Sequence, residues 1–153
     1  MLEQLQLEEQ ALTFDYFDTL IGWQMGQWLV NQAITRQLPI AIQITMMHKT
    51  IFTFSMPQAT SFNHTWIKRK QNTVYYFEHS SLWVMHKVNN DMNVLKDRYG
   101  LAIGDYAAIG GGYPLLVKGL GCVGTICVSG LAHTEDHDII VECLKQFTKK
   151  TGD

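Results

Sequence analysis

Two neighbouring segments that alternate between apolar and polar residues constrain the fold of this chain most strongly. Ile40–Met46 alternates with period two, and Ile51–Met56 does the same after a short polar turn. Successive side chains of a strand point to opposite faces of a sheet, so the pattern predicts two strands, and the short connection predicts a hairpin. Pro57 ends the second strand. We therefore expect a chain built around an antiparallel sheet.

Segments with helical spacing surround this hairpin. Asp18 is a plausible cap for a helix that runs until Leu38 and Pro39, where the pattern stops. A shorter amphipathic segment before it is expected to pack against the body of the protein or against a neighbouring subunit. Further helices are predicted to begin at Asn63, at Ser80 or Ser81 and running toward Asn90, and at His133 or Thr134.

The region from Ala107 to Gly130 is predicted to form further strands, broken by glycines that permit bulges and close backbone approach. The chain contains no linker, repeat or low-complexity segment. We therefore expect one domain spanning residues 1–153, of the α/β (α+β) class, with one antiparallel sheet covered by helices.

Composition argues against several classes of function. The chain of 153 residues has a formal net charge of -2 and a pI near 6.3, so it lacks the basic field that nucleic-acid binding requires. No segment is apolar for long enough to cross a membrane, and the amino terminus does not resemble a signal peptide. We expect a cytoplasmic protein. Three cysteines without metal-site spacing are expected to act as small buried apolar residues.

A dinucleotide-binding pattern, G-x-G-x-x-G, is present at Gly119–Gly124. In a true dinucleotide site these glycines lead into a helix, whose amino end binds pyrophosphate. Here the β-branched segment Thr125–Val128 follows instead. The pattern therefore predicts a hairpin turn rather than a cofactor loop.

Three consecutive glycines and one lysine are candidate ligand-binding residues. Gly110, Gly111 and Gly112 could leave backbone N–H groups open to an anion or a flat ligand, or they could form a bulge or a tight crossing of strands. Lys70 lies on the same helical stripe as Trp66. Its ammonium group either reaches the edge of the sheet or supplies a cation to a partly apolar pocket.

The start of the last predicted helix carries further candidates. His133 and His137 are four residues apart, but the residues between them do not form the H-E-x-x-H zinc motif. His137 could be a buried histidine with a hydrogen-bond partner, or less plausibly a metal ligand. Asp136 could stabilise the helix start, orient His137, or bind a ligand. Ser129 is a candidate by residue type. We assign no metal site.

Several segments together resemble a known family. They are Leu7–Gln10 leading to Phe14 and Phe17, Leu38–Ile42, Trp66–Lys70, Ser80–Ser81, Gly111–Pro114, Gly121–Leu131 and Glu135–His137. Over nearly the full length, the chain resembles the HbpS/GlcG-like superfamily, often called haem-degrading-domain proteins, and in particular its short, uncharacterised cytoplasmic branch.

This resemblance implies a profilin-like sandwich with a five-stranded antiparallel sheet, assembled into dimers and then into a larger symmetric complex. It makes haem a possible cofactor, because certain relatives bind haem or a corrinoid. It implies no secure enzymatic activity. One departure is that Ile109 occupies the position before the paired glycines where this branch usually has His, so no role of that His can be transferred.

Three functions remain open at this point. The first is a homo-oligomeric protein that binds haem or another small ligand, in a pocket formed by Lys70, Gly110, Gly111, Gly112, Ser129, Asp136 and His137. The second is an oligomeric scaffold or interaction module without a ligand. The third is an enzyme that uses Asp136 and His137 for acid–base chemistry, with Lys70 as electrostatic stabiliser. We rank them in this order.

Overall fold

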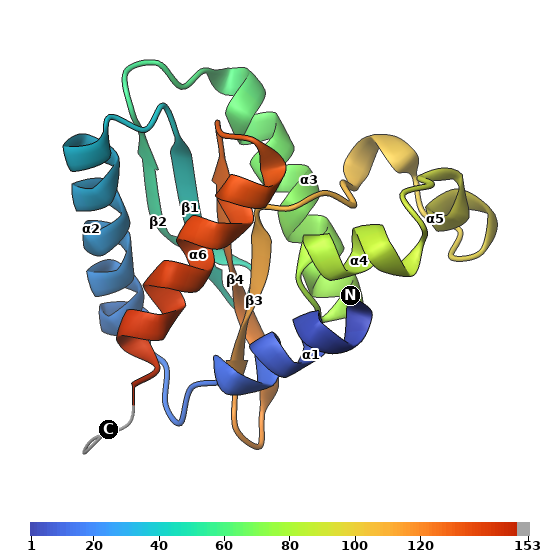
Figure 1. The fold of residues 1–153 in the computed structure, drawn as a ribbon, viewed down its shortest axis with the longest axis horizontal. Coiled ribbons are helices and arrows are strands. Elements are labelled where there is room, and N and C mark those ends of the chain that lie inside the picture. The colour runs from blue at the N-terminus through green and yellow to red at the C-terminus, as the bar shows by residue number, and fades with distance from the viewer. Residues whose placement is uncertain (150–153) are drawn as a thin grey trace.

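Two β-hairpins form one antiparallel sheet in the computed structural model, which describes residues 1–149 (Figure 1). The first hairpin consists of β1 (Ala41–Met46) and β2 (Lys49–Ser55), as the alternation predicts. The second consists of β3 (Gly112–Val117) and β4 (Gly121–Ser129). The two hairpins join where β1 pairs with β4, which gives the strand order β2-β1-β4-β3. Of the dinucleotide-like glycines, Gly119 lies in the turn of the second hairpin, while Gly121 and Gly124 belong to β4, so the pattern forms part of a hairpin, as predicted.

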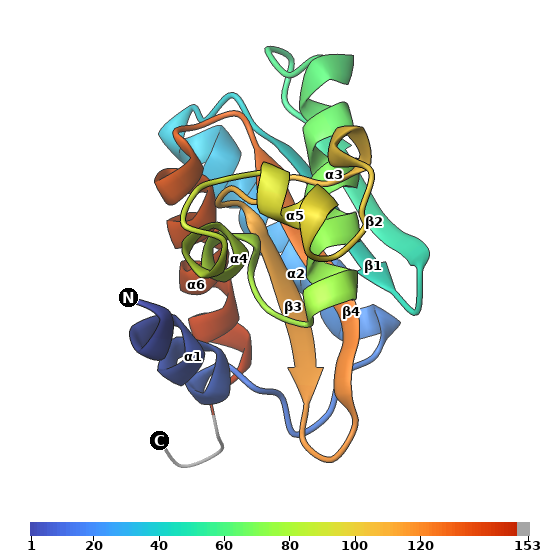
Figure 2. The same ribbon diagram turned by 90° about the vertical axis from the view of Figure 1, so that its right-hand side faces the viewer.

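Helices cover both faces of this sheet, as Figures 1 and 2 show. One face is covered by α2 and α6, while α3 lies on the other face, against β4, β3 and β1. The short helix α1 packs against α4, beside the sheet. The bounds are α1 (Leu2–Ala11), α2 (Thr19–Arg36), α3 (Ser61–Phe77), α4 (Ser81–Lys87), α5 (Asn93–Asp97) and α6 (His133–Phe147), with a 3₁₀ turn, η1 (Ile103–Asp105).

The alternation along the strands divides the core into two layers. Ile42 and Ile126 are fully buried in the cluster that includes side chains of α2 and α6. Their sequence neighbours Ala41 and Cys127 point the other way and pack with Ile67 of α3. Both faces of the sheet are therefore apolar and covered, which explains why four of the six residues of β1 and the last six of the nine residues of β4 are buried.

The helix starts predicted at Asp18, at Ser80 or Ser81, and at His133 or Thr134 are confirmed. A side-chain oxygen of Asp18 accepts a backbone N–H of the first turn of α2 at 2.9 Å, and Ser80 caps α4 in the same way at 3.1 Å. The cap predicted at Asn63 is wrong by three residues. Thr60 is the N-cap, and the Asn63 side chain accepts the Thr60 N–H at 3.0 Å, because the pair forms a capping box.

The helix predicted to run toward Asn90 ends at Lys87. Asn89 and Asn90 both adopt left-handed backbone conformations, with φ of 54° and 55°, which stop the helix. The chain then forms α5 and η1, which the sequence pattern did not indicate. Within residues 1–149, no helix combines the length and the apolar character that crossing a membrane requires.

The expectation of five strands is corrected to four within the described part of the chain. At the outer edge of β3, where a fifth strand could add, Phe14 makes a single parallel bridge with Val117. Its N–H donates to the Leu116 carbonyl at 2.7 Å, and its carbonyl accepts the Lys118 N–H at 2.9 Å. Pairing ends there because the chain must turn at once to reach the cap of α2 at Asp18.

Candidate functional site

A buried ion pair joins the helices on the two faces of the sheet. The Lys70 ammonium of α3 lies 3.3 Å from an Asp136 carboxylate oxygen of α6, and it donates to the Val128 carbonyl at 2.9 Å. Only 3% of Lys70 and 2% of Asp136 are exposed. The second Asp136 oxygen accepts the Leu131 N–H at 3.0 Å. Burial raises the pKa of Asp136 to about 6, although Lys70 acts in the opposite direction.

Gly111 makes room for this ion pair. Its φ of +120° lies in the region that favours glycine, and a Cβ at this position would lie 2.4 Å from the Lys70 nitrogen and 2.6 Å from the Val128 oxygen. The absence of a side chain therefore allows the ammonium group to reach the end of β4. This is the close-packing alternative of the two that the sequence left open.

The other two glycines of the triplet donate their backbone N–H groups to side chains. Gly110 donates to His133 Nδ1 at 3.2 Å, and Gly112 donates to Ser81 Oγ at 2.9 Å. An anion could bind an open row of N–H groups, but two of these three groups are already occupied. The glycine triplet is thus a packing element next to the site rather than an anion cradle.

A cavity of about 300 Å³ lies directly above the ion pair. It is bounded by the first half of α3, the segment before β3, the end of β4 and the first turn of α6. Of the predicted site residues, Lys70, Ser129 and Asp136 line it, whereas the three glycines and His137 do not. The lining residues are Phe62, Asn63, Trp66, Lys70, Ile109, Ser129, Gly130, Leu131, His133 and Asp136.

Three side chains that line this cavity each have at least one polar hydrogen that no described residue accepts. Lys70 has three N–H bonds and uses two. The Ser129 hydroxyl accepts from the Asn63 amide at 3.3 Å, which leaves its own hydrogen for a ligand. In His133, Nδ1 accepts the Gly110 N–H, so Nε2 carries the proton of the neutral ring. The cavity therefore offers donors to an oxygen acceptor.

The sequence indicated His133 only as one of two histidines whose spacing does not match the zinc motif. In the structure, His133 lines the cavity. Burial lowers its pKa, and the nearby charges of Lys70, His137 and His86 lower it further. The ring is consequently neutral at physiological pH. The signal in the sequence was its position at the start of a helix that follows a glycine-containing turn, which is too common a pattern to select one histidine.

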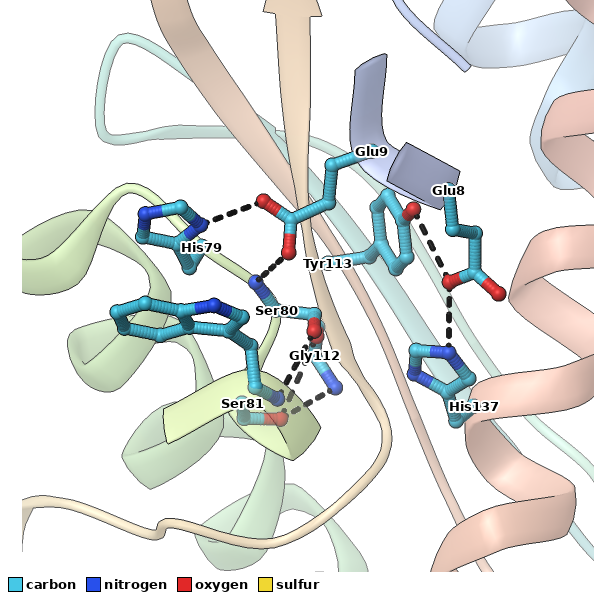
Figure 3. A network of polar contacts seen from close by, with 9 residues as sticks. Glu8, Glu9, His79, Ser80, Ser81, Gly112, Tyr113 and His137 are labelled. Atoms are coloured by element: carbon cyan, nitrogen blue, oxygen red, sulfur yellow. Dashed lines mark hydrogen bonds and ion pairs between the residues drawn. The ribbon is translucent and has the colours of Figure 1, made fainter. Parts of the chain in front are cut away.

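His137 faces a different part of the protein from Asp136, which corrects the expectation that both line one pocket. Successive residues of a helix point about 100° apart. The His137 Nε2 lies 2.9 Å from an oxygen of Glu8, and the Tyr113 hydroxyl donates to the same oxygen at 3.2 Å (Figure 3). His137 is 3% exposed and has the hydrogen-bond partner that the structural interpretation requires. The geometry offers no support for an Asp136–His137 acid–base pair.

The neighbouring carboxylate of α1 anchors a second histidine. Glu9, which is 3% exposed, lies 2.7 Å from His79 Nδ1 and accepts the Ser80 N–H at 3.3 Å (Figure 3). The His79 ring stacks on Trp83 with a centroid distance of 3.7 Å. Glu8 and Glu9 together attach α1 to the body of the protein. Sequence reasoning gave them no role, because adjacent glutamates on a short helix are typical of a solvated surface.

The sequence and the fold together define a domain of the HbpS-like class. The family model described as "Haem degrading protein HbpS-like" matches residues 17–145, and the chain belongs to this family. The resemblance noted in the sequence is thereby confirmed.

The relatives at higher identity are named UPF0303 proteins. The chain is 38% identical over 146 residues to a UPF0303 protein of Serratia proteamaculans, with 95% of this chain and 91% of the relative covered. It is 40% identical over 143 residues to a UPF0303 protein of Paraburkholderia phymatum, with 94% and 87% covered.

Two solved structures show the same fold at lower identity. The Ybr137w protein superposes with a TM-score of 0.88 at 24% identity, over 97% of this chain and 87% of that one. A complex named PduOC:Heme superposes with a TM-score of 0.70 at 20% identity, over 88% and 99%. These similarities establish the arrangement of helices and strands.

Proposed function

We propose that this protein binds a small molecule with a flat apolar body and an oxygen-acceptor head, such as an aromatic carboxylate, in the cavity above Lys70 and Asp136. Ligand sites combine apolar walls with a few convergent polar groups, and a cavity of about 300 Å³ falls at the lower end of the usual range. Phe62 and Trp66 supply an aromatic wall, with their rings in an edge-to-face contact at 6.1 Å.

The single observation that carries this proposal is the set of free donors in one cavity. Lys70, Ser129 and His133 each present a hydrogen that no described residue accepts. Lys70 and Ser129 are buried and His133 is half-buried, so a ligand oxygen that accepts from them replaces contacts with water and gains about 0.5–1.5 kcal/mol per hydrogen bond. The raised pKa of Asp136 adds a titratable group at the same place, as is common in functional sites.

Iron-ligated haem does not fit the residues of this cavity. A histidine ligates iron through a nitrogen lone pair, but Nδ1 of His133 faces the Gly110 N–H and Nε2 carries the proton. Ile109, which replaces the His usual in this branch, lines the same cavity and offers no ligand.

The first test is a titration with 3-phenylpropionate in which calorimetry measures binding. In parallel, native mass spectrometry measures the uptake of hemin. His133→Asn is the informative variant, because the Asn side-chain oxygen can still accept the Gly110 N–H while the Nε2–H donor is lost. We expect saturable binding of 3-phenylpropionate to the native protein, and about ten-fold weaker binding to His133→Asn, the effect of one hydrogen bond to a charged group.

His86→Asn is the matched control. His86 acts electrostatically on His133, so a second control, His48→Asn, is added. His48 is exposed in the β1–β2 turn and does not line the cavity, and both control variants should bind 3-phenylpropionate as the native protein does. Equal affinity of native protein and His133→Asn contradicts the proposal. Stoichiometric uptake of hemin with a histidine-ligated absorption spectrum that disappears in His133→Asn contradicts it as well, and favours haem as the ligand.

A second proposal concerns self-association, which one surface of the structure favours. Leu20, Trp23 and Ile34 of α2 are 70%, 50% and 58% exposed, which is unusual for side chains of this size on one helix. This helix packs against β2, whose outer edge is unpaired within the described residues. We propose that a second copy of the chain covers this surface.

The oligomeric state of Trp23→Arg tests the second proposal, with Leu7→Arg as control. Leu7 is 64% exposed on α1 and lies outside the α2 surface. Native mass spectrometry should show a smaller assembly for Trp23→Arg and an unchanged one for Leu7→Arg. A native protein that is monomeric, or two variants that assemble equally, would exclude this surface as the contact.

A further inference from the structure

A second cavity, of about 500 Å³, lies at the other end of β4 from the site described above. Three segments meet there: the β1–β2 turn, the β3–β4 turn and the carboxyl end of α3. The residues that matter for its chemistry are Met47, His48, Tyr75, Glu78, Leu120 and Cys122. None of them was singled out as a site residue by the sequence patterns, and none takes part in the function proposed above.

One wall of this second cavity is aromatic and held in place by a chain of hydrogen bonds. The His48 ring stacks on Tyr75 with a centroid distance of 3.9 Å and an interplanar angle of 24°. The Tyr75 hydroxyl accepts the His48 N–H at 3.0 Å and lies 2.6 Å from Thr45 Oγ1, which in turn lies 2.7 Å from Thr125 Oγ1. The wall is therefore formed before any ligand arrives.

The electrostatic character of the second cavity is negative. Glu78 lines it, and the Glu78 carboxylate has no hydrogen-bond or ion-pair partner among residues 1–149. Glu78 is the C-cap of α3, where the unsatisfied carbonyl groups of the helix add partial negative charge. The thiol of Cys122 is neutral, because burial raises its pKa to about 11. A carboxylate at the negative end of a helix attracts a cation.

Backbone conformation also distinguishes this place. Six non-glycine residues of the described chain have positive φ, and three of them line the second cavity: Met47 at 50°, His48 at 66° and Glu78 at 56°. Residues other than Gly and Asn are disfavoured in the left-handed region of positive φ. Met47 and His48 form the two-residue turn of the β1–β2 hairpin, and Glu78 ends α3, so these conformations hold the two turns that border the cavity in place.

We propose that the second cavity binds a small organic ammonium ion, with its charged nitrogen beside Glu78 and its apolar body against the His48–Tyr75 stack. A cation next to an aromatic face gains from the ring quadrupole, and a carboxylate adds direct Coulomb attraction. Met47 and Leu120, which are 68% and 74% exposed, flank the entrance and lose apolar surface to water when such a ligand binds.

The test compares phenethylamine with 2-phenylethanol, which has the same apolar body and no charge. Backbone amide NMR signals of residues 47, 48, 120 and 122 report binding at this cavity. We expect both compounds to shift these signals and phenethylamine to bind more tightly. In Glu78→Gln, the affinity for phenethylamine should fall by up to about five-fold, the range of an exposed ion pair, while that for 2-phenylethanol stays unchanged.

A second variant separates charge from folding. Glu78→Gly removes the carboxylate and also relieves the left-handed backbone, so it should unfold at a higher temperature than the native protein while showing the same loss of affinity. Glu135→Gln, an exposed carboxylate on α6, is the matched control and should bind phenethylamine normally. Equal affinities of the native protein for the amine and the alcohol, or signal shifts at other residues, overturn the proposal.

Discussion

Replacing Lys70 by Met should destabilise the protein in a way that depends on pH. The substitution keeps most of the apolar stem, and removes the charge that faces Asp136 and the hydrogen bond to Val128. Removal of one partner from a buried ion pair leaves an uncompensated charge and costs about 3–5 kcal/mol. We expect the free energy of unfolding at pH 7 to fall by this amount.

The pKa of Asp136 determines how this loss changes with pH. In the native protein the pKa is about 6, compared with an ordinary value of 3.8, because burial disfavours the charged form. The folded state thus binds more protons between these values, and the contribution of this group to stability falls as pH rises from about 4 to 6. At about 1.4 kcal/mol per pKa unit, the contribution lost above pH 6 is about 3 kcal/mol.

Lys70→Met should raise the pKa of Asp136 further, because Lys70 is the group that lowers it most. At pH 5 the carboxyl group of the variant is neutral, and the native Asp136, with a pKa of about 6, is also mostly protonated. The cost of Lys70→Met should therefore shrink by up to about 1.4 kcal/mol between pH 7 and pH 5, the value of one pKa unit. Urea unfolding of native protein and Lys70→Met at pH 7 and pH 5 measures both values.

The double variant with Lys70→Met and Asp136→Asn provides the control for this reasoning. It removes both charges, so it should recover part of the stability that Lys70→Met loses at pH 7. Because residue 136 no longer titrates, the free energy of unfolding of this variant should lack the change between pH 5 and pH 7 that Asp136 contributes. A cost of Lys70→Met that is the same at both pH values would refute the assignment of this pH dependence to Asp136.

Three further substitutions or modifications test other parts of the structure. Gly111→Ala should lower the free energy of unfolding by more than about 2 kcal/mol because of its positive φ and close contacts, whereas Gly104→Ala, with open space around it, should change it by less than about 0.5 kcal/mol; equal effects would contradict the packing role. Glu9→Ala should cost about 2 kcal/mol in urea unfolding by leaving the buried Ser80 N–H and the part-buried His79 ring without their partner, whereas Glu3→Ala, at an exposed position of the same helix, should cost little, and a small effect of Glu9→Ala would show that α1 is not anchored there. Cys122 should react with iodoacetamide at pH 7.5 at least about ten times more slowly than N-acetylcysteine, because its pKa is about 11, and equal rates would refute this burial.

The parts of the fold that the sequence predicts correctly are those that depend on local patterns. The hairpin of β1 and β2 follows from strict alternation, and the start of α2 follows from Asp18, whose side chain satisfies a backbone N–H within its own segment. The error at Asn63 has the same local origin. Both Thr60 and Asn63 favour a helix start, and only the box between them shows which residue lies outside the helix.

The parts that could not be predicted depend on contacts between distant segments. Lys70 contacts Asp136, which is 66 positions away in the chain. The helical stripe that contains Lys70 shows which face of the helix is covered, but it does not show which residue faces the ammonium group. Glu8 meets His137 across 129 positions. The glycine triplet illustrates the same limit, because whether Gly111 binds a ligand or yields space to an ammonium group depends on what faces it.

The position of Lys70 has a consequence for how variation in this protein would be observed. The same ammonium group forms the floor of the candidate ligand cavity and joins α3 to α6 across the sheet, as Figure 2 places them. A substitution there cannot alter recognition alone, because it also changes the fraction of molecules that survive proteolysis in the cell. Substitutions that change ligand preference would therefore be tolerated at Phe62, Trp66 and Ile109 in the cavity walls. Loss of Lys70 would be observed first as a lower amount of the protein in the cell.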